Sequence, residues 1–214
     1  MARAARTSLP ETDVRERFVA AGLRALQEYG AAELTLRRVA ELAGSSTMGV
    51  YTRFGGRTGM LEAIYRRGFE LLRVALVAAE QEATLSGEQD VGQRIVRLAT
   101  AYRRFALENP ALYALMFERP LPDFDPSPAL RSEALNSTFT LLIDEVRRAQ
   151  GRGLVAGHDP VRPSYLVWTA IHGIVSIELT HAVRSPLPGW FLDSAEVGQQ
   201  VLVDGVSAQL VGLR

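Results

Sequence analysis

The segment from Thr35 to Phe54, TLRRVAELAGSSTMGVYTRF, carries side chains whose types and spacing point to a chemical task. A hydroxyl residue stands at each of two expected helix starts, Thr35 and Ser46. There, free backbone N–H groups and a side-chain oxygen can together bind a phosphate. Gly44 lies between the two helices, where a tight turn favours a positive φ. The pattern predicts two short helices that cross at a steep angle, with small Ala40 and inward Val50 allowing their approach.

The second of these helices, predicted over 46–54, has an uncharged outer surface. At about 100° per residue, a buried Val50 has Thr47 and Phe54 near it. The side chains expected to face outward or to flank that face are Met48, Gly49, Tyr51 and Thr52. Such a small surface fits a major groove about 12 Å wide. Because no Arg, Asn or Gln faces outward, we expect weak direct reading of bases, with specificity from dimer spacing and DNA shape.

The elements that must position these residues are helical. Apolar residues recur at helical spacing along nearly the whole chain, and no strand-like alternation of any length occurs. We therefore predict an all-α fold of about nine helices. Four precede the loop at Thr84–Gly87; the first ends at Gly30 and the fourth runs from about 58 to 82. The later helices are predicted over 91–107, 110–117, 128–150, 160–184 and 194–213.

Residues 12 to about 73 closely resemble the tetracycline-repressor-type (TetR) family of bacterial regulators. The match comprises Leu34-Thr35, Val39-Ala40, Ala43-Gly44, Tyr51, Phe54, Arg57 and Leu61. The resemblance implies an N-terminal three-helix, helix-turn-helix DNA-binding module and a helical C-terminal domain that dimerises. It also implies double-stranded DNA as a partner.

The family's functional positions fall on particular residues of this chain. The resemblance places base contacts on Thr47, Met48 and Gly49, and phosphate contacts on Thr35, Tyr51 and Arg57. The chain departs from the family pattern at Arg57, where Lys is usual and a guanidinium changes the geometry. It also departs at Ser45, which is polar where an apolar residue is common.

These observations predict three regions. Residues 1–11 form a flexible N-terminal arm, either solvated or placing Arg3 and Arg6 in a minor groove. Residues 12–73 form the DNA-binding domain, with its helix-turn-helix motif over 35–54. Residues 74–214 form a ligand-binding and dimerisation bundle. The Pro- and Asp-rich stretch 120–128 is predicted to be a mobile loop, serving as a lid or only as a connector.

The last two helices carry candidate dimer contacts. The helix over 160–184 is apolar almost all round, so both of its sides should be covered. One face of each helix carries mostly small residues, which would allow a partner to approach: Thr169, Gly173, Ser176, Thr180, Gly198, Leu202, Gly205 and Ala208. We expect two helices from each of two chains to form a four-helix core. The alternative is packing within one chain.

Aromatic and sulfur side chains are candidates for a pocket that binds a small apolar or amphipathic effector. They are Tyr102, Phe105, Tyr113, Met116, Phe117, Phe139 and Trp168, with His172 orienting a polar group. The alternative is that they form only core. NPALYALMF and WTAIHG resemble a TetR C-terminal subtype marked by Trp, His and Gly.

Composition excludes several classes of protein. The chain has 214 residues and a formal net charge of zero. Because it contains no Cys, disulfide scaffolds and thiol chemistry are excluded. Residues 1–73 hold twelve Arg against eight acidic residues, an excess that phosphates would favour. The N-terminus lacks an apolar signal region and no stretch resembles a membrane span, so we expect a cytoplasmic protein.

Two rival functions stay open. Glu178-Leu-Thr-His181 has the form used in di-iron bundles, but no second copy exists and three His are too few for most metal sites. We therefore expect no enzyme activity, catalytic residue, cofactor or metal. The other rival is an activator, or a regulator that answers no ligand. The predicted function is a homodimeric repressor that a small molecule releases from a palindromic operator.

Overall fold

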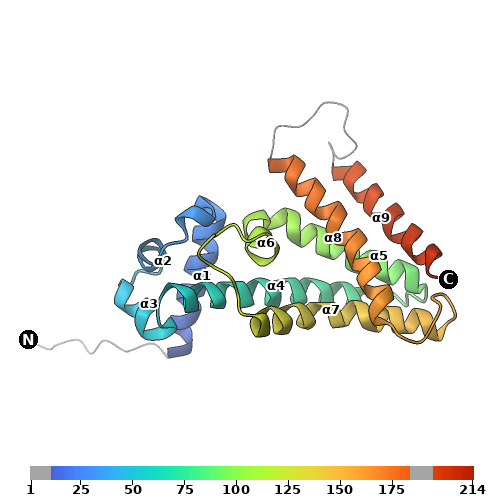
Figure 1. Cartoon of the computed structure of the whole chain (residues 1–214), viewed down its shortest axis with the longest axis horizontal. Coiled ribbons are helices and arrows are strands. Elements are labelled where there is room, and N and C mark those ends of the chain that lie inside the picture. Colours follow the sequence, from blue (N-terminus) through green and yellow to red (C-terminus); the bar gives the residue numbers. More distant parts are fainter. Residues whose placement is uncertain (1–10, 184–194) are drawn as a thin grey trace, which may run out of the picture. The chain divides into compact units, whose positions relative to one another are not determined.

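The computed structural model describes residues 11–183 and 195–214, with side chains from Val14 to Thr180 and from Ala195 onward (Figure 1). Within these ranges the chain forms nine α-helices and one 3₁₀ helix and no strand, which confirms the predicted all-α class. No described helix combines the length and hydropathy needed to cross a membrane. The helices are α1 (Glu11–Tyr29), η1 (Ala31–Glu33), α2 (Leu36–Leu42), α3 (Thr47–Phe54), α4 (Arg57–Leu85), α5 (Val91–Glu108), α6 (Pro110–Phe117), α7 (Pro128–Gly151), α8 (Val161–Val183) and α9 (Ala195–Gly212).

The helix ends follow local sequence signals, and most predicted bounds agree within a few residues. Thr35 and Ser46 occupy the N-cap positions of α2 and α3, as their hydroxyl groups predict. Asp90 caps α5 by accepting a hydrogen bond from the backbone N–H of Gly92 at 2.8 Å, a signal that the sequence analysis did not use. The predicted arm, with Arg3 and Arg6, lies outside the described residues apart from Glu11, where α1 begins.

The chain divides into two compact units. Unit 1 extends to Gly68 and also includes residues 111–127, whereas unit 2 comprises residues 69–110 and 128–214. Helix α4 therefore contributes residues to both units. The division falls five residues before the predicted boundary at 73, and no pattern in the sequence indicates that 111–127 belongs with the N-terminal helices.

Unit 1 has an apolar core to which α1, α4 and the segment after α6 contribute. The side chains of Phe18, Leu26 and Ile64 are buried. Leu121 and Phe124 are also buried, so the stretch predicted to be a mobile loop or lid is a packed connection within this unit. Its Pro and Asp residues indicate a loop correctly, but the few apolar residues among them decide how it packs.

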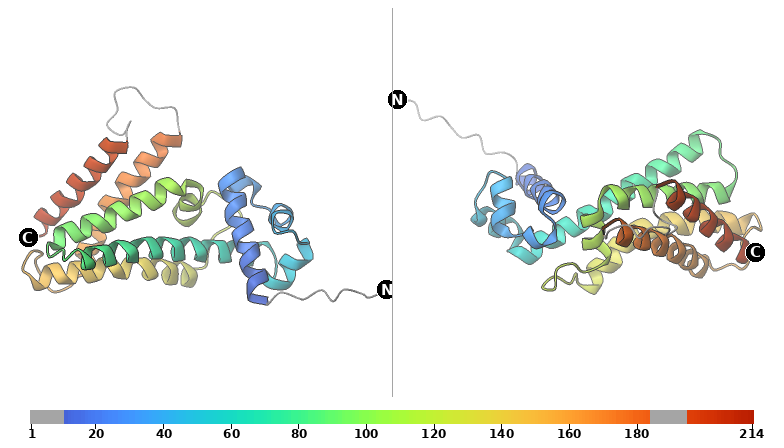
Figure 2. Two further views of the ribbon diagram at one scale, coloured as in Figure 1. Left: turned by 180° about the vertical axis from the view of Figure 1, so that it is seen from behind. Right: turned by 90° about the horizontal axis from the view of Figure 1, so that it is seen from above.

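Unit 2 is a bundle in which α5, α7, α8 and α9 pack against one another, and α8 and α9 lie side by side in both views of Figure 2. Two buried arginines cross-link it. Arg94 donates to both carboxylate oxygens of Glu145 on α7, and this hydrogen bonding raises the pKa of Arg94 above its already high usual value.

The second buried arginine, Arg103 of α5, joins three helices. Its Nε donates to Oε2 of Glu178 on α8 at 2.7 Å, and its Nη2 donates to the carbonyl oxygen of Ala195 at 3.0 Å. A Cβ at Gly198 would lie only 2.5 Å from Glu178 Oε1 and 2.8 Å from Arg103 Nη2. Gly198 therefore allows α9 to lie directly over this ion pair.

Arg103→Met should destabilise the protein strongly, because it leaves the Glu178 carboxylate buried without its cation. We expect the free energy of unfolding to fall by about 3–5 kcal/mol in urea titrations at fixed protein concentration. Arg104→Met makes the same change at the exposed neighbouring position and should alter it by less than about 0.5 kcal/mol. Equal effects of the two variants would contradict the structural role of the Arg103–Glu178 pair.

Candidate nucleic-acid interface

The turn between α2 and α3 is set by caps and by one glycine. Thr35 Oγ1 accepts a hydrogen bond from the Arg38 backbone N–H at 3.2 Å, and Ser46 Oγ accepts one from the Gly49 N–H at 3.3 Å. Gly44 has φ +60°, the left-handed conformation that its position in the turn predicts. The helix-turn-helix geometry therefore follows from residues visible in the sequence.

Arginines of α1 bind the C-terminal ends of the two short helices. Arg17 donates to the carbonyl oxygen of Ala43 at 3.2 Å and Arg24 to that of Leu42 at 2.6 Å, while Arg15 donates to that of Arg53 at 2.9 Å. A cation is favourable at a helix C-terminus, where carbonyl groups lack helical partners. Sequence analysis missed these roles, although Arg17 and Arg24 lie two helical turns apart on one face of α1.

The inner face of α3 is fixed against α1. Val50 is fully buried, as predicted. A Cβ at Gly49 would lie 3.0 Å from both the Phe18 ring and Ser45 Oγ, so this position faces inward more than the helical wheel predicted. The Phe18 and Phe54 rings meet edge to face at 6.0 Å. Gly49 thus has a packing role, and its predicted base contact stays a prediction.

The outer face of α3 is uncharged and accessible. Met48 is 69 % exposed and Tyr51 is 53 % exposed, and the side chains of Thr47 and Thr52 are exposed too. Thr47 was expected near the buried face, but it is the first residue of α3 and is not covered there. Thr52 Oγ1 donates to the Met48 carbonyl at 2.9 Å, which leaves its oxygen free to accept from a base.

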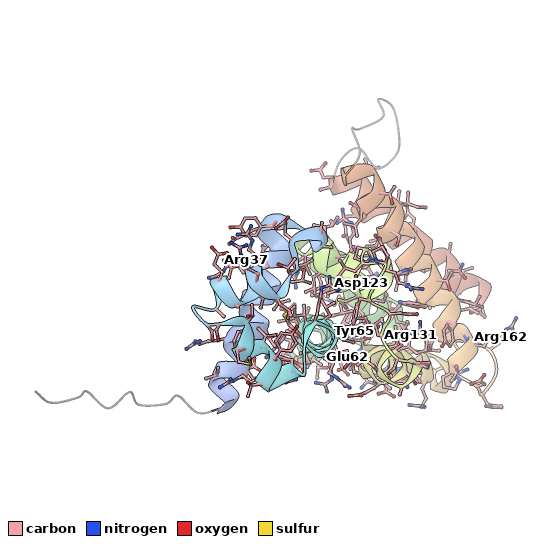
Figure 3. The ribbon with its side chains drawn as sticks, turned by 60° about the vertical axis from the view of Figure 1, so that its left-hand side comes forward. Arg37, Glu62, Tyr65, Asp123, Arg131 and Arg162 are labelled. Atoms are coloured by element: carbon pink, nitrogen blue, oxygen red, sulfur yellow. The ribbon has the colours of Figure 1, made fainter. Side chains whose placement is uncertain are left out.

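Two arginines of α2, Arg37 and Arg38, differ in how their charges are engaged. Arg38 pairs with Glu33 and Glu41 and lies over the Tyr29 ring, so its charge is largely neutralised. Arg37, labelled on α2 in Figure 3, is exposed, and within the described part of the chain no carboxylate pairs with it. Arg37 lines the same surface cavity as Thr35. It is a candidate phosphate contact that sequence analysis missed.

Arg57, the predicted phosphate contact at the start of α4, is not free. It forms an ion pair with Asp123, which lies between α6 and α7 and within the same unit. Sequence analysis could not anticipate this pair, because the two residues lie 66 positions apart.

The predicted dimer residues behave differently on the two helices. On α8, Thr169 and Thr180 are exposed, Ser176 is half-buried, and no atom lies within 4 Å of a Cβ built at Gly173. On α9, Gly198 and Leu202 are buried within unit 2, and a Cβ at Gly205 would meet Ile174 of α8 at 2.8 Å.

Those α9 positions are thus used inside the chain, which corrects the prediction that they face a partner. Gly198 and Gly205 lie against α8, because small residues also allow two helices of one chain to pack closely. Ala208 remains exposed. The accessible side of α9 runs through Val201, Asp204, Ala208 and Val211, at steps of three and four residues.

The predicted pocket residues are divided between the two units. Tyr113, Met116 and Phe117 belong to unit 1, where the rings of Tyr113 and Phe117 contact each other with centroids 4.8 Å apart. Tyr102, Phe105, Phe139, Trp168 and His172 belong to unit 2. The effector contacts predicted for these eight residues stay a prediction.

In unit 2 a polar pair lies among these rings. The Tyr102 hydroxyl is hydrogen-bonded to His172 Nδ1 at 2.8 Å, and the Trp168 ring lies 5.1 Å from the imidazole. Desolvation by burial lowers the pKa of His172, so the imidazole is neutral at pH 7. A neutral imidazole can both donate and accept a hydrogen bond.

The rival metal site receives no support from the described residues. The side chain of His181 lies outside them, and Glu178 is engaged by Arg103. Among the residues whose side chains are described, no group of three His, Asp or Glu is placed to hold a metal ion.

Comparison with known proteins gives two family matches. Residues 18–64 match the model described as bacterial regulatory proteins, tetR family, and residues 95–202 match the tetracyclin repressor-like C-terminal domain. The HTH-type transcriptional regulator Rv1816 of Mycobacterium tuberculosis is 22 % identical over 191 residues, covering 78 % of this chain and 80 % of the relative.

Solved structures share the fold. A protein of unknown function from Rhodococcus sp. RHA1 aligns with a TM-score of 0.75 at 24 % identity, covering 99 % of each chain. A TetR family transcription regulator from Marinobacter aquaeolei VT8 aligns with a TM-score of 0.67 at 18 % identity, covering 92 % of this chain and 96 % of that one.

Arg24→Met should loosen α2, because it removes a charged donor from the helix C-terminus. We expect unfolding free energy to fall by about 1 kcal/mol and amide hydrogen exchange over Leu36–Leu42 to accelerate. Arg73→Met removes the same charge from an exposed site in unit 2 and should leave that exchange unchanged. Unaltered exchange in both variants would show that the Arg24 contact does not hold α2.

Proposed function

The chain belongs to the tetR family of bacterial regulatory proteins, and we propose that it is a homodimeric repressor, released from a palindromic operator by a small molecule. The family and the relatives are DNA-binding transcriptional regulators rather than enzymes. The finer points, namely repression, dimerisation and release by a ligand, are the proposal. Because its proposed targets are promoters on the bacterial chromosome, the proposal places its action in the cytoplasm.

The observation that best supports the proposal is the uncharged, accessible outer face of α3. In this account Met48 contacts thymine methyl groups, while Thr47 and Thr52 offer single hydroxyl groups to base edges. Thr35, Ser46, Tyr51, Arg37 and Arg57 contact phosphates and fix the register. Because no bidentate side chain lies on this face, each half-site is read weakly, and the spacing of two half-sites adds specificity.

Dimerisation through α8 and α9 supplies that spacing. The accessible stripe of α8 runs through Leu166, Thr169, Gly173, Ile177 and Thr180, so a second helix can approach closely at its centre. Together with the accessible side of α9 it forms a self-complementary surface for a twofold axis. Such a dimer holds two α3 helices about 34–36 Å apart, or a multiple of that distance.

Ligand release rests on the polar pair inside unit 2. Tyr102 and His172 can orient a polar group of an amphipathic effector, while the rings of Trp168 and Phe139 contact its apolar part. A ligand that prefers a subunit arrangement with the wrong spacing lowers DNA affinity. A coupling of about 1–3 kcal/mol gives roughly 5- to 150-fold release.

Repression is preferred to activation because a dimer seated on a promoter blocks it without further contacts. Activation, or regulation without a ligand, is the alternative. Assignment to the subtype marked by Trp168, His172 and Gly173 remains part of the proposal, since the C-terminal match covers these residues without singling them out.

Selection of bound duplexes from a random pool tests the function. We expect a palindrome whose two half-sites are centred about one helical turn, or a multiple, apart. Few positions within each half-site should be near-invariant guanine, because α3 presents no Arg for bidentate contacts. Enrichment of an asymmetric single site, or no enrichment at low ionic strength, would contradict the proposed mode of binding.

Ile177→Glu tests the dimer surface. Ile177 is 52 % exposed on the α8 stripe, one helical turn from Gly173, so a carboxylate there must be desolvated at the interface. We expect a shift to monomer in light scattering and a loss of operator binding of about 100-fold or more. Val74→Glu is the matched control, because Val74 is 65 % exposed on α4 and lies off the stripe. Unchanged mass for Ile177→Glu would contradict this interface.

A further inference from the structure

Three contacts align along one side of the first half of α4, all within unit 1. Arg57 pairs with Asp123, the Tyr65 ring meets the Phe124 ring at 6.3 Å, and a Cβ at Gly68 would meet Met116 Sδ at 2.8 Å. The α4 positions 57, 65 and 68 lie on one face of a helix. Figure 3 labels Tyr65 of α4 and Asp123 of the segment that packs against it. Residues 111–127 therefore lie along α4 as far as its N-terminal end, where Arg57 is the predicted phosphate contact.

Asp123 is held there by its neighbours. Leu121 and Phe124 are buried, and the Phe124 N–H donates to the Leu121 carbonyl at 3.1 Å, which forms a tight turn around Asp123. The carboxylate itself stays at the surface: the Asp123 side chain is 64 % exposed and the Arg57 side chain 29 % exposed. The backbone thus fixes where the carboxylate lies, while solvent can still reach the ion pair.

We propose that Asp123 is an intramolecular competitor for the DNA backbone, holding the Arg57 guanidinium until a phosphate displaces it. The inference rests on the proposed function, in which Arg57 contacts a phosphate. A carboxylate and a phosphate both offer two oxygens to a guanidinium, so they compete for the same donors. In the complex the displaced carboxylate also lies near the phosphate chain and repels it. Asp123 therefore weakens DNA binding and reduces its dependence on salt.

Asp123→Asn tests this competition with almost no change in shape. The probes are a fluorescein-labelled mixed-sequence duplex and the duplex selected from the random pool, titrated by anisotropy at several salt concentrations. We expect Kd to fall about four- to tenfold, since each of two arginines contributes about two- to threefold. The slope of log K against log salt should steepen by about one for each arginine released.

Asp125→Asn is the matched control. It removes the same charge from the same segment, but the ion pair described for Asp125 is with Arg119, at 3.6 Å. Its effect on Kd should stay below about twofold, the size expected from long-range screening alone. In an Arg57→Gln background, Asp123→Asn should lose its specific effect and match Asp125→Asn.

The outcomes separate this inference from the proposed function. If the unaltered protein binds DNA but Asp123→Asn and Asp125→Asn change Kd equally, competition is wrong and the function stands. If Asp123→Asn weakens binding, Asp123 positions Arg57 for DNA instead, which also overturns the inference. If the unaltered protein binds no duplex at low ionic strength, the proposed function itself fails.

Discussion

The packing of α3 against α1 is the constraint on which the interface depends. Buried Val50 and the missing side chain at Gly49 allow α3 to approach the Phe18 ring, and this packing leaves the opposite side of the helix outside. Met48, Tyr51 and Thr52 are exposed because the other side of an eight-residue helix is fixed. So short a helix is not stable by itself, so tertiary packing must hold its orientation. Arg15 adds to that packing by donating a hydrogen bond to the Arg53 carbonyl oxygen near the end of α3.

Arginine has several structural tasks in this lysine-free chain, and they change how its charge should be interpreted. The excess of positive charge in the first third indicated a phosphate-binding surface. Much of that charge is instead engaged, by helix ends for Arg24, by carboxylates for Arg38 and by Asp123 for Arg57. Arg37 contributes a charge that no described carboxylate neutralises. DNA affinity therefore depends on which guanidinium groups a phosphate can reach more than on their number.

Local features of the fold were predictable, and features that join distant segments were not. The caps at Thr35 and Ser46 and the turn at Gly44 depend on a few adjacent residues, so the sequence reveals them. The inward direction of Gly49 depends on Phe18, and the buried face of α9 depends on Glu178; both required the tertiary structure. Likewise, the packing of the Pro- and Asp-rich stretch after α6 into unit 1 rests on two buried apolar side chains, Leu121 and Phe124. Periodicity locates a stripe, but the choice between two stripes of similar size depends on neighbouring helices.

Photo-crosslinking from methionine tests most directly whether the outer face of α3 enters the major groove of DNA. Met48 is exposed on that face, whereas Met60 and Met116 are buried, so replacing methionine with its diazirine analogue gives the described part of the chain one accessible probe. Illumination of the protein bound to its selected duplex should join Met48 to bases in each half-site. If the protein still binds the duplex but position 48 forms no crosslink to DNA, the proposed role of α3 is contradicted.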